Sequence, residues 1–520
     1  MRTAELAGAL CLATDLGMGF PFEHGLQTTL IAMRLADRLG VDSQTAMETY
    51  YGSLLAHSGC TTEAWVAAEV FGGSLTTKLG PVIFGSPRQQ FAGIIGALPN
   101  PESALPLRAI QVARRLPRAA KLHKPQLAAL CEVAQTLSEQ LGLPDSVPRL
   151  FPNMTERWDG KGALSRAKGD EIPPAIRITH VAMDAAVQGL LGGGERAVAV
   201  IRERAGHAFD PEVAACFVDD ARAILGFDAE ASAWEEALAC EPRPSLTLEG
   251  DAIERALVAM AGFTDLISPH LVGHSTGVAE LAAAAAATCR LDPAAVRAIR
   301  RAGLVHDIGR VGVGAAVWEK QGRLTVAEWE QVRLHPYHTD RVLTRSPFLA
   351  ALAPVAGAHH ERLDRSGYHR GAAGAELTLA ARLLAAADAY QAMTEPRPYR
   401  DAFSKSEAAQ MLADDARAGR LDTDAVSAVI DAAGQPAPRL ERPAGLTERE
   451  VEVVRLLARG LQTKQIARAL GISGKTADHH IQNAYSKLTV STRSAATLVA
   501  MEHGLVAWGE LPIARPASDS

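Results

Sequence analysis

Two stretches of 22 residues, 205 positions apart, are similar to each other, and this repeat constrains the fold more than any other feature of the sequence. ERWDGKGALSRAKGDEIPPAIR at residues 156–177 aligns with ERLDRSGYHRGAAGAELTLAAR at residues 361–382. Seven of the positions that are identical in this register are Glu156, Arg157, Asp159, Gly162, Gly169, Glu171 and Arg177, which recur as Glu361, Arg362, Asp364, Gly367, Gly374, Glu376 and Arg382. The sequence therefore predicts two copies of one structural unit.

Both copies extend upstream of the repeated stretch. LLAHSGC around His57 resembles LVHDIGR around His306, and His24 precedes a helical stretch as His274 does, at offsets of 249 and 250 positions. Because the offset then falls by 44, the first copy holds about 44 additional residues, for which the Gly- and Pro-rich stretch 72–106 is the natural place. The predicted boundaries are a first copy at 1–226, a linker at 227–250, a second copy at 251–434, a linker at 435–445, a final module at 446–508 and a disordered tail at 509–520.

The composition favours helices and argues against several classes of protein. The chain is 48% apolar, 22% charged and only 5% aromatic, with long Ala- and Leu-rich stretches, which is typical of an all-α globular protein. A net charge of −6 excludes a uniformly basic nucleic-acid coat, although one small basic module fits within that average. Six scattered cysteines without a CxxC pair indicate a reducing cytoplasm, and no apolar run approaches the ~18 residues of a membrane span.

The second copy concentrates residues of the types that bind metals. Imidazoles and carboxylates suit Fe, Mn, Zn or Ni, and a carboxylate can bridge two ions. Seven such groups are too many for one four-coordinate ion and suit a two-metal site, which can hold a phosphate and activate water. The candidate ligands are His274, His306, Asp307, His335, His359, His360 and Asp388.

Five blocks of the second copy together resemble the HD-GYP family of phosphohydrolases. They are LVHDIGRVGV, GRLTVAEWEQVRLHP, AGAHHERLDRSGYHRG, LLAAADAYQAMTEPRPYR and the segment at His274. The resemblance implies an all-helical fold. It also implies an enzyme that hydrolyses cyclic dinucleotides, chiefly cyclic di-GMP, at a centre of two or three divalent transition metals. It makes the seven candidates the metal ligands, with Asp307 bridging, and makes Asp307 and Arg310 catalytic. The substrate-binding residues it implies are Arg310, Gly367, Tyr368 and Arg397.

Several positions depart from the family pattern. Arg310 replaces a Lys that faces the phosphate, and a guanidinium keeps the charge but distributes it differently. The GYP signature reads Gly367-Tyr368-His369, so the identity of the substrate is open. His270 lies four residues before His274, hence on the same helical face, and is either an extra ligand or an ordinary surface residue.

The first copy keeps part of this pattern but lacks several of the candidate metal ligands. His24 and His57 remain, but Ser58 stands where the second copy has Asp307. Met154-Thr155 replaces the pair of histidines, and Met183 replaces Asp388, although a one-residue slip would bring in Asp184. We expect a catalytically inactive HD-GYP-like domain with a sensory or structural role.

The final module carries the pattern of a helix-turn-helix. Thr447-x-x-Glu450 is a capping box that begins a first helix, and a second short helix runs from Thr463 to Leu470. Ser473 caps a third helix. Four of its residues point inward at 4-3-4 spacing: Ala477, Ile481, Ala484 and Leu488.

The module resembles the LuxR-type helix-turn-helix, a four-helix DNA-binding domain, through LTxRExEV, GxxxKxIAxxL, ISxKT and KLxVxTR. That resemblance implies binding to double-stranded DNA as a homodimer paired through the last helix, residues 491–503. It makes Asp478, His479 and Gln482 the residues that face bases, with Thr476 beside them. The phosphate-binding candidates it implies are Lys464, Lys475, Lys487 and Arg493.

Two functions agree with these patterns. In the first, the chain is a transcription regulator whose second copy is a metal-dependent phosphodiesterase acting on a small nucleotide such as cyclic di-GMP. In the second, it is a ligand-responsive transcription factor whose HD-GYP-like site binds metal and nucleotide without turnover. DNA binding is common to both.

Overall fold

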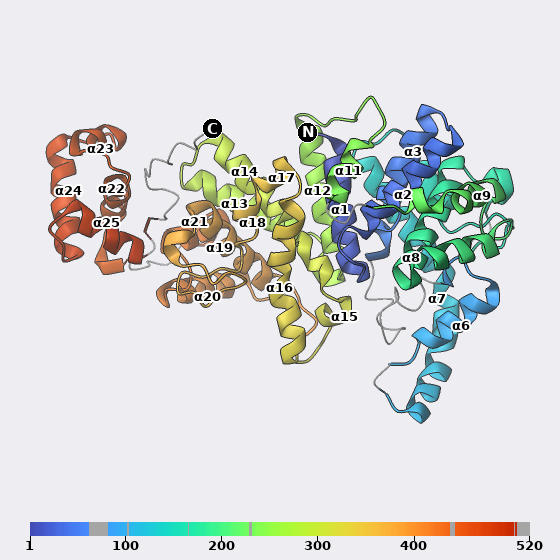
Figure 1. Ribbon diagram of the computed structural model, residues 1–520. Helices are drawn as coiled ribbons and strands as arrows, with labels where there is room; N and C mark the ends of the chain where they lie inside the picture. Colours follow the sequence, from blue (N-terminus) through green and yellow to red (C-terminus); the bar gives the residue numbers. More distant parts are fainter. Residues whose placement is uncertain are drawn as a thin grey trace. The chain divides into compact units, whose positions relative to one another are not determined.

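A computed structural model of the chain describes residues 1–61, 82–100, 103–164, 166–227, 231–436, 443–503 and 505–506. Within these ranges all regular elements are α- or 3-10 helices, and extended segments pair only at isolated bridges, which confirms the prediction of an all-α fold (Figure 1). None of the described helices is both long and apolar enough to span a membrane. The chain divides into two compact units, 1–273 with 307–350 and 274–306 with 351–520.

The first unit holds the first copy and two segments of the second copy, residues 251–273 and 307–350. Its helices are α1 (Thr3–Met18), α2 (His24–Leu39), α3 (Ser43–Leu54), η1 (Ser58–Thr61), α6 (Pro87–Ala97), α7 (Leu105–Gln140), η3 (Pro148–Asn153), η4 (Gly169–Glu171), α8 (Pro174–Arg204), α9 (Pro211–Asp219), α10 (Ala221–Ile224), α11 (Ala233–Ala239), α12 (Asp251–Asp265), η5 (Pro269–Leu271), η6 (Ile308–Gly312), α15 (Ala315–Trp318), α16 (Val326–Leu343) and α17 (Pro347–Ala350). Twelve of the sixteen residues of α1 are buried, because that helix is apolar on all sides and lies in the core.

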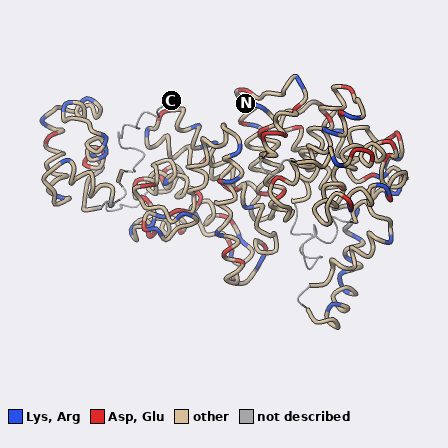
Figure 2. Tube along the Cα trace, viewed as in Figure 1, with Lys and Arg blue, Asp and Glu red and all other residues tan. Residues whose placement is uncertain are grey.

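The additional residues of the first copy lengthen a helix. At the offset of 205, α16 aligns with residues 121–138, so the N-terminal half of the 36-residue α7 has no counterpart in the second copy. The expected segment 72–106 therefore holds only part of the additional length, and its residues 72–81 and 101–102 lie outside the described ranges. The part of α7 without a counterpart, residues 105–120, carries basic but no acidic side chains (Figure 2): Arg108, Arg114, Arg115 and Arg118.

Within the first unit, α1 packs against η6, the turn that directly follows His306-Asp307. The approach is close, because a Cβ built on Gly17 would lie 2.7 Å from Cγ1 of Val311. The Arg341 guanidinium of α16 also stacks on the Phe22 ring, 4.0 Å from its centroid. The first copy thus supplies part of the surroundings of the HD turn of the second copy.

The second unit consists of α13 (His274–Thr288), α14 (Pro293–Val305), α18 (Ala353–Ala356), η7 (Gly374–Glu376), α19 (Leu379–Thr394), α20 (Lys405–Arg417), α21 (Thr423–Ala432), η8 (Pro443–Gly445), α22 (Glu448–Ala458), α23 (Thr463–Ala469), α24 (Gly474–Lys487) and α25 (Arg493–Glu502). The Ala-rich α13 packs against α14, α19 and α21. Small residues let these helices approach closely, since a Cβ on Gly303 would lie 2.7 Å from Cα of Ala279.

The repeated residues build the same loop in both copies. The carboxylate of Glu156 accepts a hydrogen bond from the backbone N–H of Arg166 at 3.1 Å. The carboxylate of Glu361 likewise accepts from the N–H groups of Arg370 and Ala372, at 2.7 and 2.9 Å. A buried carboxylate that accepts backbone N–H groups fixes the path of a loop, because leaving those donors unpaired would be costly.

A repeated arginine fastens this loop to a later helix in each copy. Arg177 pairs with Asp210 at 2.8 Å, and Asp210 caps the N-terminus of α9. Arg382 pairs with Asp422 at 3.1 Å, and Asp422 caps the N-terminus of α21. The duplicated stretch therefore specifies the scaffold of the fold, while the metal-ligand candidates differ between the copies.

Candidate metal centre and DNA-binding module

Three predicted ligands meet in the interior of the second unit. His274 is the first residue of α13, His306 directly follows α14, and Asp388 lies in α19. The Nε2 atoms of His274 and His306 lie 3.3 and 3.8 Å from Oδ1 of Asp388, and all three side chains are buried. Their potential ligand atoms lie within 4.8 Å of one another, a geometry able to hold a metal ion.

The two histidines after α18 join this cluster. Nδ1 of His360 lies 3.6 Å from Oδ2 of Asp388, and the rings of His306 and His359 are 4.7 Å apart. Nδ1 of His306 and Nδ1 of His359 each donate to a backbone carbonyl at 2.6 Å. Because a carbonyl only accepts, Nδ1 carries the proton and Nε2 is left as the ligand atom.

The environment of Asp388 keeps it ionised. Burial alone would raise the pKa of this carboxyl, but the four surrounding imidazoles together outweigh burial and hold the pKa well below its usual range: His274, His306, His359 and His360. A buried carboxylate surrounded by imidazoles is a suitable ligand set for a divalent transition metal.

Glu395, which follows α19, is a residue of the site that the sequence analysis did not identify. Its Oε2 accepts from Nδ1 of His274 at 2.9 Å, and it also contacts Gln391 and Arg397. Burial would raise the pKa of Glu395, but the hydrogen bond from His274 contributes to lowering it instead. Carboxylates in this position orient a metal-binding imidazole. An acidic residue at a helix end is ordinarily solvated, so no sequence signal marked it.

The other two ligand candidates lie in the first unit, beside Arg310. Nε2 of His335 is 3.3 Å from Oδ1 of Asp307, and Nδ1 of His335 donates to the carbonyl of Val332 at 2.6 Å. Burial lowers the pKa of His335, which favours the neutral imidazole that binds metals. The Arg310 guanidinium pairs with Oδ2 of Asp307 at 2.5 Å.

The substrate-binding candidates of the second unit lie beside the candidate ligands or beside Glu395. The Tyr368 ring stands 4.7 Å from the His360 ring, and Arg397 pairs with Glu395 at 2.9 Å. A Cβ on Gly367 would lie 2.5 Å from the carbonyl oxygen of His360, so only glycine fits there.

The expectation that His270 and His274 share one helical face is wrong. Pro269 begins the separate 3-10 turn η5, and Gly273, with φ of 85°, breaks the chain direction before α13 begins at His274. The His270 side chain instead lies 3.8 Å from the Glu319 carboxylate.

The histidines and the aspartate that remain at these positions of the first copy contact neighbouring side chains of the same copy. The Phe20 ring stacks on His24 at 4.2 Å and meets the edge of His57 at 5.8 Å. Burial lowers the pKa of both histidines to about 4. Asp184 pairs with Arg204 at 2.6 Å, so a register slip gives no ligand there. Within the described part of the first copy, no three candidate ligands gather as they do in the second unit.

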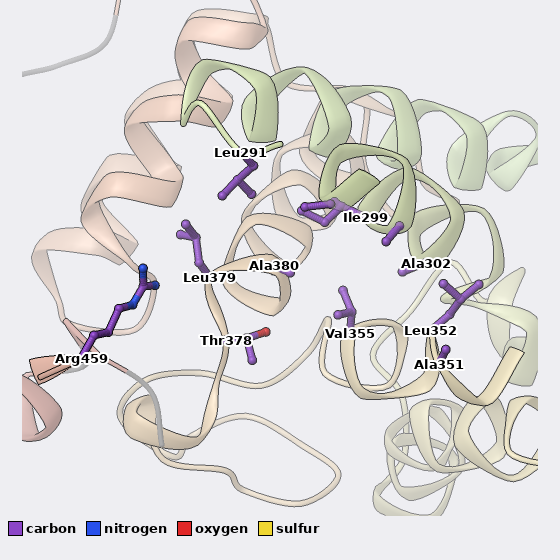
Figure 3. Close-up of a pocket in the computed structure, with 12 residues that line it drawn as sticks. Leu291, Ile299, Ala302, Ala351, Leu352, Val355, Thr378, Leu379, Ala380 and Arg459 are labelled. Carbon is purple, nitrogen blue, oxygen red and sulfur yellow. The ribbon is translucent and has the colours of Figure 1, made fainter. Parts of the chain in front are cut away.

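An apolar pocket of about 270 Å³ lies among α14, α18 and the start of α19 (Figure 3). Ile299, Leu352, Val355 and Leu379 are among its lining residues. None of the predicted ligand or substrate residues lines it, so this pocket is separate from the metal-ligand cluster.

The final module has the predicted helix-turn-helix architecture, formed by α22 to α25. Thr447 and Glu450 form the capping box of α22, and the Ser473 hydroxyl caps α24. The inward face of α24 is confirmed, because its four predicted core residues are buried: Ala477, Ile481, Ala484 and Leu488. The predicted DNA-facing residues of α23 and α24 are exposed: Lys464, Lys475, Thr476, Asp478, His479 and Gln482.

Two of the phosphate-binding candidates have contacts within the module. Nζ of Lys487 pairs with the Glu450 carboxylate at 2.7 Å. Arg493 donates to the carbonyls of Gly460 and Leu461, at 3.1 and 2.6 Å. These contacts tie α24 and α25 to α22 and the turn after it, so both cations stabilise the module.

Comparison with known proteins agrees with the repeat and with the module. The HD domain family matches residues 102–213 and 263–425, one match in each copy, and the luxR family of bacterial regulatory proteins matches residues 444–500.

Among curated proteins, the 3′3′-cGAMP-specific phosphodiesterase 3 of Vibrio cholerae is 29% identical over 405 residues, which are 77% of this chain and 88% of that protein. The cyclic di-GMP phosphodiesterase PA4108 of Pseudomonas aeruginosa is 36% identical over 162 residues, 31% of this chain and 39% of that protein. A crystal structure of a cyclic GMP-AMP specific phosphodiesterase from V. cholerae shares the fold, with a TM-score of 0.57 and 24% identity over 84% of this chain and 98% of that one.

Proposed function

Because the chain belongs to the HD-domain family and ends in a LuxR-type DNA-binding domain, we propose that it is a transcription regulator with a metal-dependent phosphodiesterase domain. The proposed substrate is a cyclic dinucleotide, the class named for two of its relatives. The catalytic domain is residues 251–434 and the DNA-binding domain is residues 446–508. The observation that carries the proposal is the buried cluster of His274, His306 and Asp388.

Seven residues of this chain would hold two divalent transition-metal ions. Five of them gather in the second unit, while Asp307 and His335 pair in the first. By the resemblance to the HD-GYP family, the Asp307 carboxylate would be shared between the two ions. The donor set fits Fe, Mn, Zn or Ni. When bound, such ions supply Lewis acidity and a water of lowered pKa near the phosphodiester.

The protein side chains have separate tasks in this proposal. Arg310 binds the non-bridging phosphate oxygens, because its planar fork matches a phosphate. Tyr368, beside His360, and Arg397, beside Glu395, face the nucleotide. Glu395 holds the His274 ring in the tautomer that leaves Nε2 for the metal.

The test is hydrolysis of a panel of cyclic dinucleotides by the purified full chain loaded with Mn²⁺ or Fe²⁺. Linear dinucleotides or mononucleotides should form with wild type and vanish with Asp388→Ala. The matched control is Asp431→Ala, which removes an exposed carboxylate at the end of α21. Absence of hydrolysis by metal-loaded wild type for every dinucleotide would contradict the enzyme proposal.

A second candidate is a ligand-responsive transcription factor with an inactive metal and nucleotide site. Two features favour it: the Arg310 guanidinium is paired with Asp307, and His369 stands in place of the signature proline. This candidate predicts that metal-loaded protein binds a cyclic dinucleotide, changes its affinity for DNA and releases no product.

The DNA-binding function is proposed for a homodimer in the cytoplasm. By the resemblance to LuxR-type domains, two modules would pair through their last helices. On that helix, α25, the apolar side chain of Leu498 is 65% exposed. Sedimentation of the full chain should give a dimer, and Leu498→Glu should shift it towards monomer.

A further inference from the structure

Arg310 is an unusually buried cation. Its side chain is 7% exposed, and only its Nη2 pairs with Asp307. Among the described residues, its Nε and Nη1 have no hydrogen-bond partner, although both atoms are buried. Burying a guanidinium with unpaired N–H groups is costly unless a further group stabilises it or a ligand completes its hydrogen bonds.

The Trp318 ring is the group that covers this cation. The guanidinium carbon of Arg310 lies 5.1 Å from the centroid of the indole, within the range of a cation–π contact. The same ring meets the edge of His335, the imidazole partner of Asp307, at 6.1 Å and 73°. Trp318 therefore touches both residues that flank the Asp307 carboxylate.

The short helix that carries Trp318 is fastened at its end. The next residue, Glu319, accepts a hydrogen bond from the Ser268 hydroxyl at 2.5 Å. Lys320 then pairs with Glu328 of α16 at 2.6 Å. These contacts fix the end of α15, so the indole is held in place independently of Arg310.

We infer that Trp318 is a positioning residue for Arg310, which keeps the guanidinium fork oriented to receive a phosphate. This inference rests on the proposed function, in which Arg310 binds the scissile phosphate. A guanidinium is planar and stacks on an aromatic face, whereas the Lys of the family pattern is a compact point charge on a flexible stem. The arginine in HDIGR thus needs a flat neighbour that a lysine would not need.

A purely structural role for Trp318 makes a different prediction. The ring also packs beside a small apolar cluster of Ile267, Leu271 and Ala315. If that packing were its whole role, leucine would lower the stability of the chain without changing its affinity for phosphate. The two roles therefore separate by their effect on anion binding.

The experiment measures binding of inorganic phosphate to the metal-loaded full chain by calorimetry, together with KM and kcat for a cyclic dinucleotide. Trp318→Leu should weaken phosphate binding about 3- to 30-fold and raise KM, and Trp318→Phe should restore most of the affinity. In an Arg310→Lys background, Trp318→Leu should have a smaller effect. Trp329→Leu is the matched control, because Trp329 is 45% exposed on α16.

Equal phosphate affinity in Trp318→Leu and Trp329→Leu would overturn the inference. Undiminished affinity in Arg310→Ala, or no phosphate binding by wild type, would overturn it as well. Wild type that binds phosphate but hydrolyses no cyclic dinucleotide would refute the phosphodiesterase alone, and the Trp318 contrast would still decide the inference. If Trp318→Leu does not fold, Trp318→Met takes its place, because methionine fills irregular space.

Discussion

Glu395 provides the sharpest test of the metal centre, because it touches a ligand without being one. Its carboxylate accepts the Nδ1–H of His274 at 2.9 Å, and the imidazole faces Asp388 with its other nitrogen. Replacing Glu395 by Gln keeps an acceptor oxygen and removes the negative charge. Replacing it by Leu removes both.

The expected magnitude follows from this contact. Loss of a carboxylate that orients a metal-bound histidine lowers metal affinity by about 10- to 100-fold, or roughly 1.4–2.8 kcal/mol. Glu395→Gln should fall near the lower figure, since the amide still accepts the hydrogen bond, and Glu395→Leu near the upper one. Neither change removes an atom from the ligand set.

The assay is a competition titration of Mn²⁺ between the full chain and a coloured chelator. Glu280→Gln is the control, because Glu280 is 57% exposed on α13 and pairs with Arg300 at 2.7 Å on the surface. If Glu395→Leu bound Mn²⁺ as tightly as Glu280→Gln, the orienting role of Glu395 would be refuted. His274 would then need to be removed from the ligand set or shown to bind without this partner.

Three further predictions follow from other parts of the chain. Burial lowers the pKa of His180 to about 4, whereas an unfolded histidine titrates near 6.5. The unfolded chain therefore takes up the proton first, and stability falls as the pH drops from about 6.5 to 4. His180→Gln should remove up to about 1.4 kcal/mol per pH unit of that dependence in calorimetric unfolding, and an unchanged slope would contradict it. Gln482→Ala should relax sequence preference on cognate against scrambled duplexes, whereas Lys475→Ala should weaken all duplexes alike and lower the salt slope by about one; an unchanged cognate-to-scrambled ratio in Gln482→Ala would refute base reading. Gly17→Val should destabilise the first unit by about 1–3 kcal/mol, because its side chain would overlap Val311, and a melting temperature equal to that of wild type would contradict the close packing of α1 on η6.

Local patterns could be predicted from the sequence, because their causes lie within a few residues. The capping box of Thr447 and Glu450 and the buried face of α24 are examples, since helical spacing alone determines which side chains point inward. The gathering of His274, His306 and Asp388 was predicted through a resemblance, and the geometry of the second unit is compatible with it.

Contacts between distant segments could not be predicted in this way. Glu395 lies 121 residues from His274, and nothing in its own neighbourhood distinguishes it from a solvated carboxylate. The prediction that His270 shares a helical face with His274 is wrong, because Pro269 and Gly273, the latter at positive φ, interrupt the helix. The pairing of Lys487 with Glu450 likewise depends on how α24 packs on α22.

The loop built twice by Glu156 and Glu361 has a consequence for how such a chain can change. The carboxylates and arginines that shape the loop are a different set from the residues that would hold metal, so either set can be altered while the other stays intact. The first copy illustrates this independence, because Met154 and Met183 fill the interior at positions where the second copy has candidate ligands, while Arg177 still holds Asp210. After duplication of this fold, one copy can therefore replace its candidate metal ligands by apolar side chains. The helices and loops around those positions keep their structure.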